Sequence, residues 1–434
     1  MNSALRVSQS ASSGFAVLVI SKALPLWTGL RDGRAAQFAA GIIRSVRDGY
    51  NVCIRGKAGA VGTRRRNSRG ARRSDRCDQP AEMCIRSLMR RTRPALRALI
   101  LALLAVTAAA PLDADQWGAI LVAGREIWPG ETKRFPYGGE TSFEAAYIDA
   151  PVFVARGIRA GPSLCITAGI HGDEINGTEI ARRSFSWVDP QDLRGTVIVF
   201  PMVNAAGVRS GNRYMQDRRD LNRAFPGTSN GSVTSIIAHT LFTEISRNCD
   251  YLIDLHTGSF SRSNHPQTRV TGKDNRALEL ARHFGVGIVV IDEGPNGSIR
   301  REASDIGIPA IIYEAGEPSR FDLDQIASGV QGIESVMTHL GMLEGGKAIT
   351  VPESRIYTQT NWVRVPIGAG GYFFPTVELG QVVRKGDRLG TIIDPLTDRY
   401  TAISADQSGE VIGLAVAQIV LSGYALVHLG VQHR

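Results

Sequence analysis

The sequence is poor in the features that mark disulfide-rich proteins. It has 5 cysteines in 434 residues, and Cys53, Cys77 and Cys84 fall in its N-terminal quarter. So few cysteines exclude a disulfide framework. Cys165 and Cys249 lie in or just before apolar strand patterns, which predicts buried free thiols. Their pairing would need an oxidising compartment and a suitable geometry.

Acidic residues are scarce at the N-terminus. Residues 1–110 contain 20 Lys and Arg against 5 Asp and Glu, whereas residues 111–434 contain 30 against 36. The formal net charge of +9 therefore comes from the N-terminal segment, and the rest of the chain is mildly acidic. This distribution argues against nucleic acid as a partner of the protein body. Nucleic-acid binding would be possible only through an arginine-rich disordered arm at the N-terminus.

Apolar runs long enough to span a membrane are also missing. The uncharged run Ala98–Ala110 is shorter than the roughly 20 residues that a spanning helix needs. It follows an arginine-rich stretch that begins at Met89, and it ends in small residues, as a secretory signal peptide does. We therefore expect a signal peptide at residues 89–110, with residues 1–88 a non-native upstream translation or a disordered arm. The mature protein would be periplasmic or secreted, without a stable membrane span, and cytoplasmic if this interpretation is wrong.

Residues 111–348 alternate between strand and helix patterns. Buried strands are predicted at 163–168, 197–203, 251–255 and 308–313, and helices at 177–187, 236–246 and 277–284. Such βα units predict an α/β fold, a mostly parallel sheet with helices on both faces. Ligands of these folds bind at the carboxyl ends of the strands.

Residues 349–434 show short alternating strands separated by Gly, Pro and Asp turns, which predicts a small C-terminal all-β domain. The stretches 380–390 and 408–411 resemble biotinyl and lipoyl domains. The hairpin that would hold their modified lysine is replaced by residues 394–399. We therefore expect a structural or substrate-gating cap and not a carrier domain.

Three candidate metal ligands follow predicted strands. His171 and Glu174 lie in the turn after the strand 163–168, and His256 follows the strand 251–255. A lone His-x-x-Glu is weak, but the carboxyl ends of parallel strands can bring these three side chains together. Two histidines and one carboxylate leave a coordination position open, as catalytic zinc sites do. The sequence therefore predicts one Zn²⁺ per chain, which would activate a water molecule.

A base for that water is predicted at Glu314, which ends the apolar strand 308–313. Four motifs then occur in order: His-Gly-Asp-Glu from His171, Asp-Leu-Asn-Arg with Phe-Pro-Gly up to Gly227, Asp-Leu-His-Thr-Gly around His256, and Glu-Ala-Gly from Glu314. In these motifs the chain resembles the succinylglutamate desuccinylase and aspartoacylase family over about 150 to 200 residues. More distantly it is similar to the zinc carboxypeptidases, whose α/β fold that family shares.

The resemblance implies roles for further residues. It places Asn222 and Arg223 at positions that bind the substrate's carboxylate, and Asp220 at a position that orients the first zinc histidine. Arg213 matches a further substrate arginine less directly, because Arg218 and Arg219 lie nearby.

The expected function is hydrolysis of an amide bond in an N-acyl amino acid or similar small carboxylate by a zinc-dependent deacylase. Carboxypeptidase-like or murein-peptide amidase activity and ester hydrolysis are the alternatives among enzymes. A metal-binding accessory protein is the alternative without catalysis, and the presence of Glu314 argues against it. The acyl group, the amine and the oligomeric state are left open.

Overall fold

The computed structural model describes residues 117–137, 150–272, 274–343, 353–416 and 418–431, together with four short strands nearer the N-terminus. Those four strands are β1 (Phe15–Leu18), β2 (Asn51–Arg55), β3 (Val61–Arg64) and β4 (Glu82–Cys84). They form an antiparallel sheet in the order β1-β3-β2-β4. The predicted signal peptide lies outside the described residues. The chain divides into two units, 1–113 and 114–434, and the second contains every residue discussed below.

The centre of the second unit is a parallel sheet in the order β10-β9-β11-β14. Its strands are β9 (Arg159–Ala168), β10 (Arg194–Phe200), β11 (Tyr251–His256) and β14 (Ala310–Gly316). Each contains a continuous buried apolar run, as expected of strands covered on both faces. All four strands predicted in this region are present.

Antiparallel strands extend this sheet on both sides. β8 (Ala150–Arg156) and β7 (Thr132–Tyr137) follow β10, and β12 (Arg262–Val270) pairs with β14. The short hairpin β5 (Ile120–Val122) and β6 (Arg125–Ile127) stands apart. The sheet is therefore mixed, with a parallel centre.

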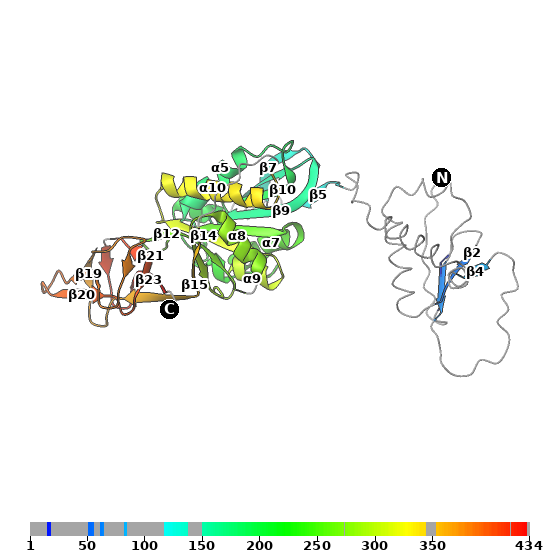
Figure 1. The fold of residues 1–434 in the computed structure, drawn as a ribbon. Helices are drawn as coiled ribbons and strands as arrows, with labels where there is room; N and C mark the ends of the chain where they lie inside the picture. The colour runs from blue at the N-terminus through cyan, green and yellow to red at the C-terminus, as the bar shows by residue number, and fades with distance from the viewer. Residues whose placement is uncertain are drawn as a thin grey trace. The chain divides into compact units, whose positions relative to one another are not determined.

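Helices cover both faces of the sheet, as predicted (Figure 1). α5 (Ile175–Ser186), α8 (Asn275–Phe284) and α10 (Leu323–His339) pack on one face, where they share a hydrophobic core with β9 and β14. α7 (Val233–Asn248) and α9 (Ile299–Asp305) pack on the other face. Two short helices, α6 (Ala205–Ser210) and η3 (Leu221–Arg223), lie in the connection between β10 and α7. No described helix has both the length and the apolar character needed to cross a membrane.

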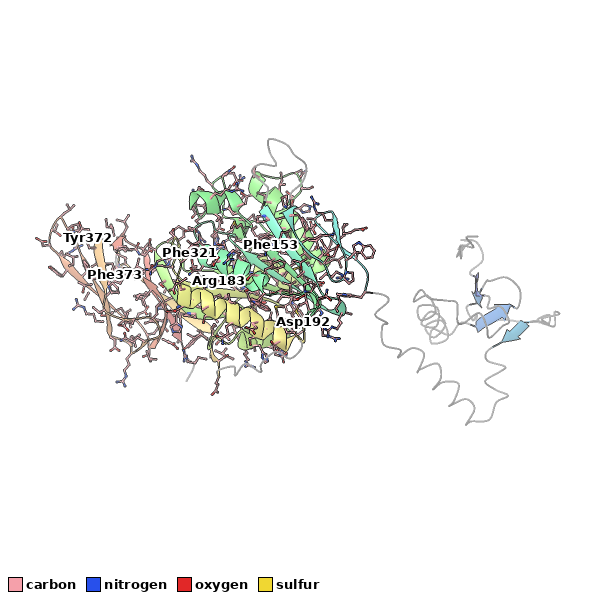
Figure 2. All side chains as sticks on the ribbon, turned by 90° about the horizontal axis from the view of Figure 1, so that it is seen from above. Phe153, Arg183, Asp192, Phe321, Tyr372 and Phe373 are labelled. Carbon is pink, nitrogen blue, oxygen red and sulfur yellow. A yellow bond between two sulfur atoms is a disulfide. The ribbon has the colours of Figure 1, made fainter. Side chains whose placement is uncertain are left out.

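The C-terminal part is all-β, with its own hydrophobic core. Its strands are β15 (Arg355–Tyr357), β16 (Gln359–Arg364), β17 (Gly371–Pro375), β18 (Val382–Val383), β19 (Arg388–Ile393), β20 (Tyr400–Ser404), β21 (Gly409–Ala415), β22 (Gln418–Val420) and β23 (Ala425–Val431). Side chains alternate between its core and its surface: Phe373 is buried, whereas the preceding Tyr372 is exposed (Figure 2). Four of these strands form a separate sheet in the order β20-β19-β17-β22.

The C-terminal part is joined to the central sheet by backbone hydrogen bonds. β21 pairs antiparallel with β12, so that Arg262, Ser263 and Asn264 lie opposite Ala415, Leu414 and Gly413. β15 also pairs with β13 (Ile288–Ile291), which in turn pairs with β12. One sheet of 13 described strands therefore runs through both parts of the unit.

The polar segment after His256, which includes His265, forms the strand β12. Its polar side chains Asn264 and Gln267 are buried, because they hydrogen-bond to Glu314 and to the backbone of Ile412. Acceptors on distant strands take the hydrogen bonds of both side-chain amide N–H groups, so a polar sequence is able to fold as a central strand.

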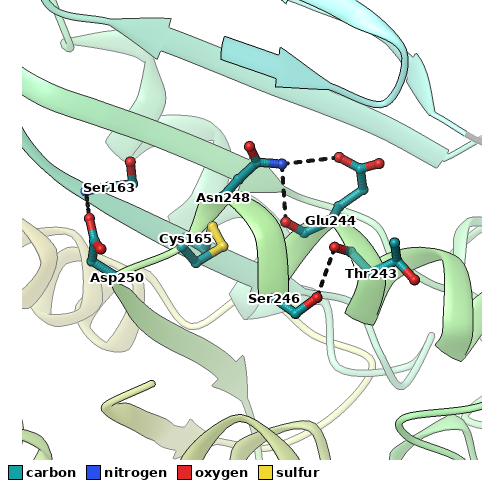
Figure 3. Close-up of a disulfide and its surroundings, with 8 residues drawn as sticks. Ser163, Cys165, Thr243, Glu244, Ser246, Asn248 and Asp250 are labelled. Atoms are coloured by element: carbon teal, nitrogen blue, oxygen red, sulfur yellow. Dashed lines mark hydrogen bonds between the residues drawn. A yellow bond between two sulfur atoms is a disulfide. The ribbon is translucent and has the colours of Figure 1, made fainter. Parts of the chain in front are cut away.

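The expectation of two buried free thiols was wrong. Cys165 of β9 and Cys249, at the end of α7, form a disulfide with their Cα atoms 5.6 Å apart (Figure 3). The backbone around it is further fixed by the Asp250 carboxylate, which accepts a hydrogen bond from the Ser163 N–H at 2.8 Å. The crosslink thus ties the end of a surface helix to the central sheet.

Candidate active site

The three predicted metal ligands meet at the carboxyl ends of β9 and β11. One ligand atom from each of His171, Glu174 and His256 lies within 4.8 Å of the others, and all three side chains are buried. Both histidines turn Nδ1 toward the Glu174 carboxylate, at 2.9 Å from His171 and 2.7 Å from His256. The Nδ1 atoms and the carboxylate therefore face one common point.

The loop between β9 and α5 is shaped to place these ligands. Glu174 occupies the N-cap position of α5, but its side chain makes no capping hydrogen bond and turns to the histidines instead. Gly172 packs closely on α6: a Cβ atom there would lie 2.1 Å from the backbone of Gly207. Glycine is required at this position because a side chain would push the ligand loop outward.

A carboxylate contacts Nε2 of each histidine, on the opposite side of the ring from Nδ1. Nε2 of His171 lies 3.0 Å from Asp220, as the family resemblance implied, and Nε2 of His256 lies 2.7 Å from Asp254. Asp254 is fully buried and also accepts a hydrogen bond from the Thr167 hydroxyl at 2.7 Å. Carboxylates in this position fix the tautomer that leaves Nδ1 free to bind a metal.

These residues fit a metal ion. Nδ1 of His171 is buried without a hydrogen-bond partner, although it lies beside the Glu174 carboxylate. Two imidazole nitrogens and a carboxylate, with the far side of each ring held by an acid, are the donor set of a catalytic zinc site. A cation held by these three side chains would satisfy this nitrogen.

The charges at this site depend on one another. Burial would raise the pKa of Glu174, but the charges and hydrogen bonds of His171 and His256 hold it well below its ordinary value. Burial likewise opposes ionisation of Asp220, whose pKa is nevertheless lowered by its hydrogen bond to His171 and by nearby arginines. Both carboxylates are therefore ionised at neutral pH.

Glu314 stands beside the metal ligands on β14, where it is the direct register partner of His256. Its carboxylate accepts a hydrogen bond from the Asn264 amide and lies 3.6 Å from Nε of Arg269. Its side chain is 18% exposed, in contrast to the 2% of Glu174. Glu314 is thus held in place and still open to the pocket.

A pocket of about 280 Å³ opens over these residues. Its lining includes His171, Glu174, His256, Glu314, Arg213, Asn222, Arg223, Arg262, Asn264, Arg269, Asp292, Arg300 and, from the C-terminal part, Trp362. Five of these side chains are arginines and three are carboxylates. The side chains that line the pocket therefore carry more positive than negative charge.

The structure brings all three predicted substrate residues to this pocket, with different contacts. Arg213 binds the metal-ligand carboxylate Glu174 at 2.6 Å and lies 3.5 Å from Asp220. The side-chain oxygen of Asn222 accepts a hydrogen bond from the backbone N–H of Ile299, at the start of α9. Arg223 is exposed and donates to the backbone carbonyl of Asn222.

Several pocket residues were not found from the sequence. Asp254 was detectable, because it lies two positions before His256 in a strand and therefore points to the same side. Asn264 and Arg269 were not identified, because the strand β12 that contains them was not predicted. Trp362 reaches the pocket through pairing of β16 with β23, which no local pattern reveals.

Comparisons with known proteins agree with this geometry. Residues 160–340 match the succinylglutamate desuccinylase/aspartoacylase catalytic domain. The chain is 27% identical over 277 residues to N-alpha-acetyl-L-2,4-diaminobutyric acid deacetylase of Halomonas elongata, covering 60% of this chain and 78% of that protein.

Solved structures show the same fold. A succinylglutamate desuccinylase/aspartoacylase from Rhodobacter sphaeroides superposes with a TM-score of 0.62 at 25% identity, over 74% of this chain and 98% of that one. The product-bound ectoine utilization protein EutE (DoeB) from Ruegeria pomeroyi gives 0.63 at 22% identity, over 75% and 98%. The predicted α/β fold is confirmed, and the chain is a hydrolase of the deacylase type. Over residues 160–340 the chain is similar to the succinylglutamate desuccinylase/aspartoacylase catalytic domain.

Proposed function

We propose that the protein is a zinc-dependent deacylase that cleaves the amide bond of a small N-acyl amino acid. The observation behind this proposal is the meeting of His171, Glu174 and His256 with Glu314 at one sheet edge, under a cationic pocket. The ligand set leaves an open coordination position and suits zinc, which polarises a carbonyl and makes its bound water more acidic. A pocket of about 280 Å³ favours a small molecule over a murein peptide.

Residues of the chain transfer the proton, orient the base and bind the substrate. Glu314 takes a proton from the attacking water and returns it to the leaving amine. Asn264 and Arg269 hold its carboxylate in the orientation for both transfers. Arg223 has the planar donor group that binds a carboxylate with two hydrogen bonds, so it anchors the amino-acid end of the substrate together with the Asn222 amide.

The test is the Glu314→Gln variant. It keeps the shape of the side chain and the Asn264 contact, but it removes the base, so turnover should fall by at least about 10²-fold. Glu317→Gln is the matched control, because Glu317 lies three positions on and pairs with Arg320 at the surface. Both variants should bind one zinc per chain by elemental analysis. Near-normal turnover of N-acyl amino acids by Glu314→Gln would place the base elsewhere.

We also propose that the protein works in the periplasm or outside the cell. The disulfide between Cys165 and Cys249 supports this location, because structural disulfides persist in oxidising compartments and are rare in the cytosol. The expected signal peptide at 89–110 is an independent argument from the sequence. N-terminal mass spectrometry of the native protein can test it, and peptides from residues 1–80 would show that the leader is retained.

A further inference from the structure

The four-stranded sheet β20-β19-β17-β22 of the C-terminal part has apolar side chains on both of its faces. On one face, Phe373, Ile392 and Ile403 are buried in the hydrophobic core of this part. The other face of such an antiparallel sheet normally carries polar side chains, because it meets water. Here the second face is apolar as well, so it departs from the pattern of a sheet that ends at solvent.

The strand register defines this second face. Directly opposed residues of an antiparallel sheet point to the same side. One row of opposed residues crosses all four strands and consists of Ile419, Tyr372, Ile393 and Tyr400. The next row consists of Phe374, Thr391 and Ala402, and Leu421 lies two positions after Ile419. We call these eight residues the outer face, and none of them is charged.

The outer face leaves a large apolar area in contact with water. Its five largest exposed side chains are between 44% and 73% exposed, and they are Tyr372, Phe374, Tyr400, Ile419 and Leu421. At about 150–200 Å² for a fully exposed side chain of this size, the five leave roughly 500–600 Å² accessible. That area is at the upper end for the largest apolar patch of a monomer, about 300–600 Å².

Two loops extend this area at one end of the sheet. They carry Ile367, which is fully exposed, and Leu396, which is 92% exposed. Arg399, in the same hairpin as Leu396, donates to the Gly368 carbonyl at 2.5 Å, so the two loops lie side by side. With these two side chains the apolar area reaches roughly 800 Å², which is the area that each partner buries in a stable interface.

The charges beside the outer face favour a second copy of this chain as the partner. Asp394 follows Ile393 directly, whereas Asp398 and Arg399 precede Tyr400, so both signs occur at one edge. An anionic membrane would select a cluster of basic residues there. A second copy related by a two-fold axis presents the same apolar face, and acidic residues of one copy can then meet basic residues of the other.

We propose that the outer face, with Ile367 and Leu396, binds the same surface of a second copy, so that the protein is a symmetric dimer joined through its C-terminal parts. Tyr372, Phe374 and Tyr400 are of the aromatic type that is enriched in such interfaces. The residues that line the active-site pocket are different ones, so both pockets stay open in the dimer. This inference concerns assembly and does not depend on the proposed activity.

Sedimentation equilibrium of the full chain tests the dimer. The wild type should be a dimer with a Kd at or below about 1 μM. The double variant Tyr400→Lys with Ile419→Lys changes one residue on each edge strand, and four ammonium groups would enter the interface. The Kd should therefore rise at least about 100-fold. Ile306→Lys is the matched control, because Ile306 is a 52% exposed side chain at the end of α9, and it should leave the Kd unchanged.

Chemical labelling tests whether the outer face itself is covered. Ala402→Cys places a thiol on the outer face, and peptide mass spectrometry follows its reaction with a maleimide. Dilution of this variant from about 50 to 0.1 μM should speed the labelling at least about fivefold, because the dimer dissociates. In the background of the two lysine substitutions the labelling rate should not depend on protein concentration.

Three results would overturn the proposal: a wild type that is monomeric at about 50 μM, far above the expected Kd, an unchanged dimer in the double variant, or labelling at position 402 that ignores dilution. Monomeric wild type that floats with vesicles of phosphatidylethanolamine and phosphatidylglycerol would assign the outer face to a membrane instead. Circular dichroism shows whether the double variant is folded. If it is not, Ile367→Lys with Leu396→Lys replaces it, since these residues lie in loops outside the strands.

Discussion

Replacing Asp254 with Asn should weaken metal binding without removing a metal ligand. Asp254 is fully buried and accepts hydrogen bonds from Nε2 of His256 and from the Thr167 hydroxyl, both at 2.7 Å. Asparagine has the same shape: its oxygen still accepts from His256, and its amide can donate to the Thr167 oxygen. The substitution therefore removes the negative charge and keeps the hydrogen bonds.

The magnitude follows from that charge. A carboxylate behind an imidazole raises its basicity as a ligand, and loss of such a group typically weakens metal binding 10- to 100-fold, about 1.4 to 2.8 kcal/mol. We expect the Asp254→Asn variant to fall in this range, because no other described carboxylate contacts Nε2 of His256. Competition with a chromogenic chelator at fixed pH measures the zinc affinity directly.

Two further variants serve as controls for this measurement. His171→Ala removes a ligand and should lose zinc under the same conditions. Asp250→Asn changes an aspartate just before β11, at the opposite end from His256, where the carboxylate only accepts from the Ser163 backbone. It should bind zinc as the wild type does. Wild-type zinc affinity in Asp254→Asn would refute the reasoning that this charge supports His256.

Two other predictions test the substrate anchor and the crosslink. Arg223→Lys keeps the charge but loses the bidentate geometry, so its catalytic efficiency on N-acyl amino acids should fall at least about tenfold with unchanged zinc content; equal hydrolysis of an acid and its carboxamide by both enzymes would contradict this anchor. Cys165→Ala combined with Cys249→Ala opens a loop of 84 residues, so the free energy of unfolding should fall by about 2–4 kcal/mol in denaturant titrations. No loss of stability would show that the crosslink is dispensable.

The sequence predicted the central part of the site because simple geometry governs it. His171, Glu174, His256 and Glu314 follow or end apolar strands, and parallel strands bring their carboxyl ends to one edge. The pairing of His256 with Glu314 in adjacent strands is the direct outcome of that rule. Order along the chain and strand periodicity were sufficient here.

The remaining features depend on contacts between distant segments. β12 is polar and contains Pro266, so its sequence resembles a loop. Its strand conformation depends on the hydrogen bonds from Asn264 to Glu314 and from Gln267 to the backbone of Ile412. The pairing of Cys165 with Cys249 spans 84 residues and depends on where α7 ends. Such information is absent from any short window of sequence.

The ladder between β12 and β21 limits how a substrate can enter. Trp362 belongs to the part of the chain that this ladder fastens to the catalytic sheet, and Arg262 lies in the ladder itself. A hinged lid would have to break several backbone hydrogen bonds at each turnover. The wall of the pocket that contains Trp362 is thus formed when the protein folds. The pocket therefore has a fixed width, and this width selects the substrates. Changes of specificity during evolution should then fall on the side chains of that wall and not on hinge residues.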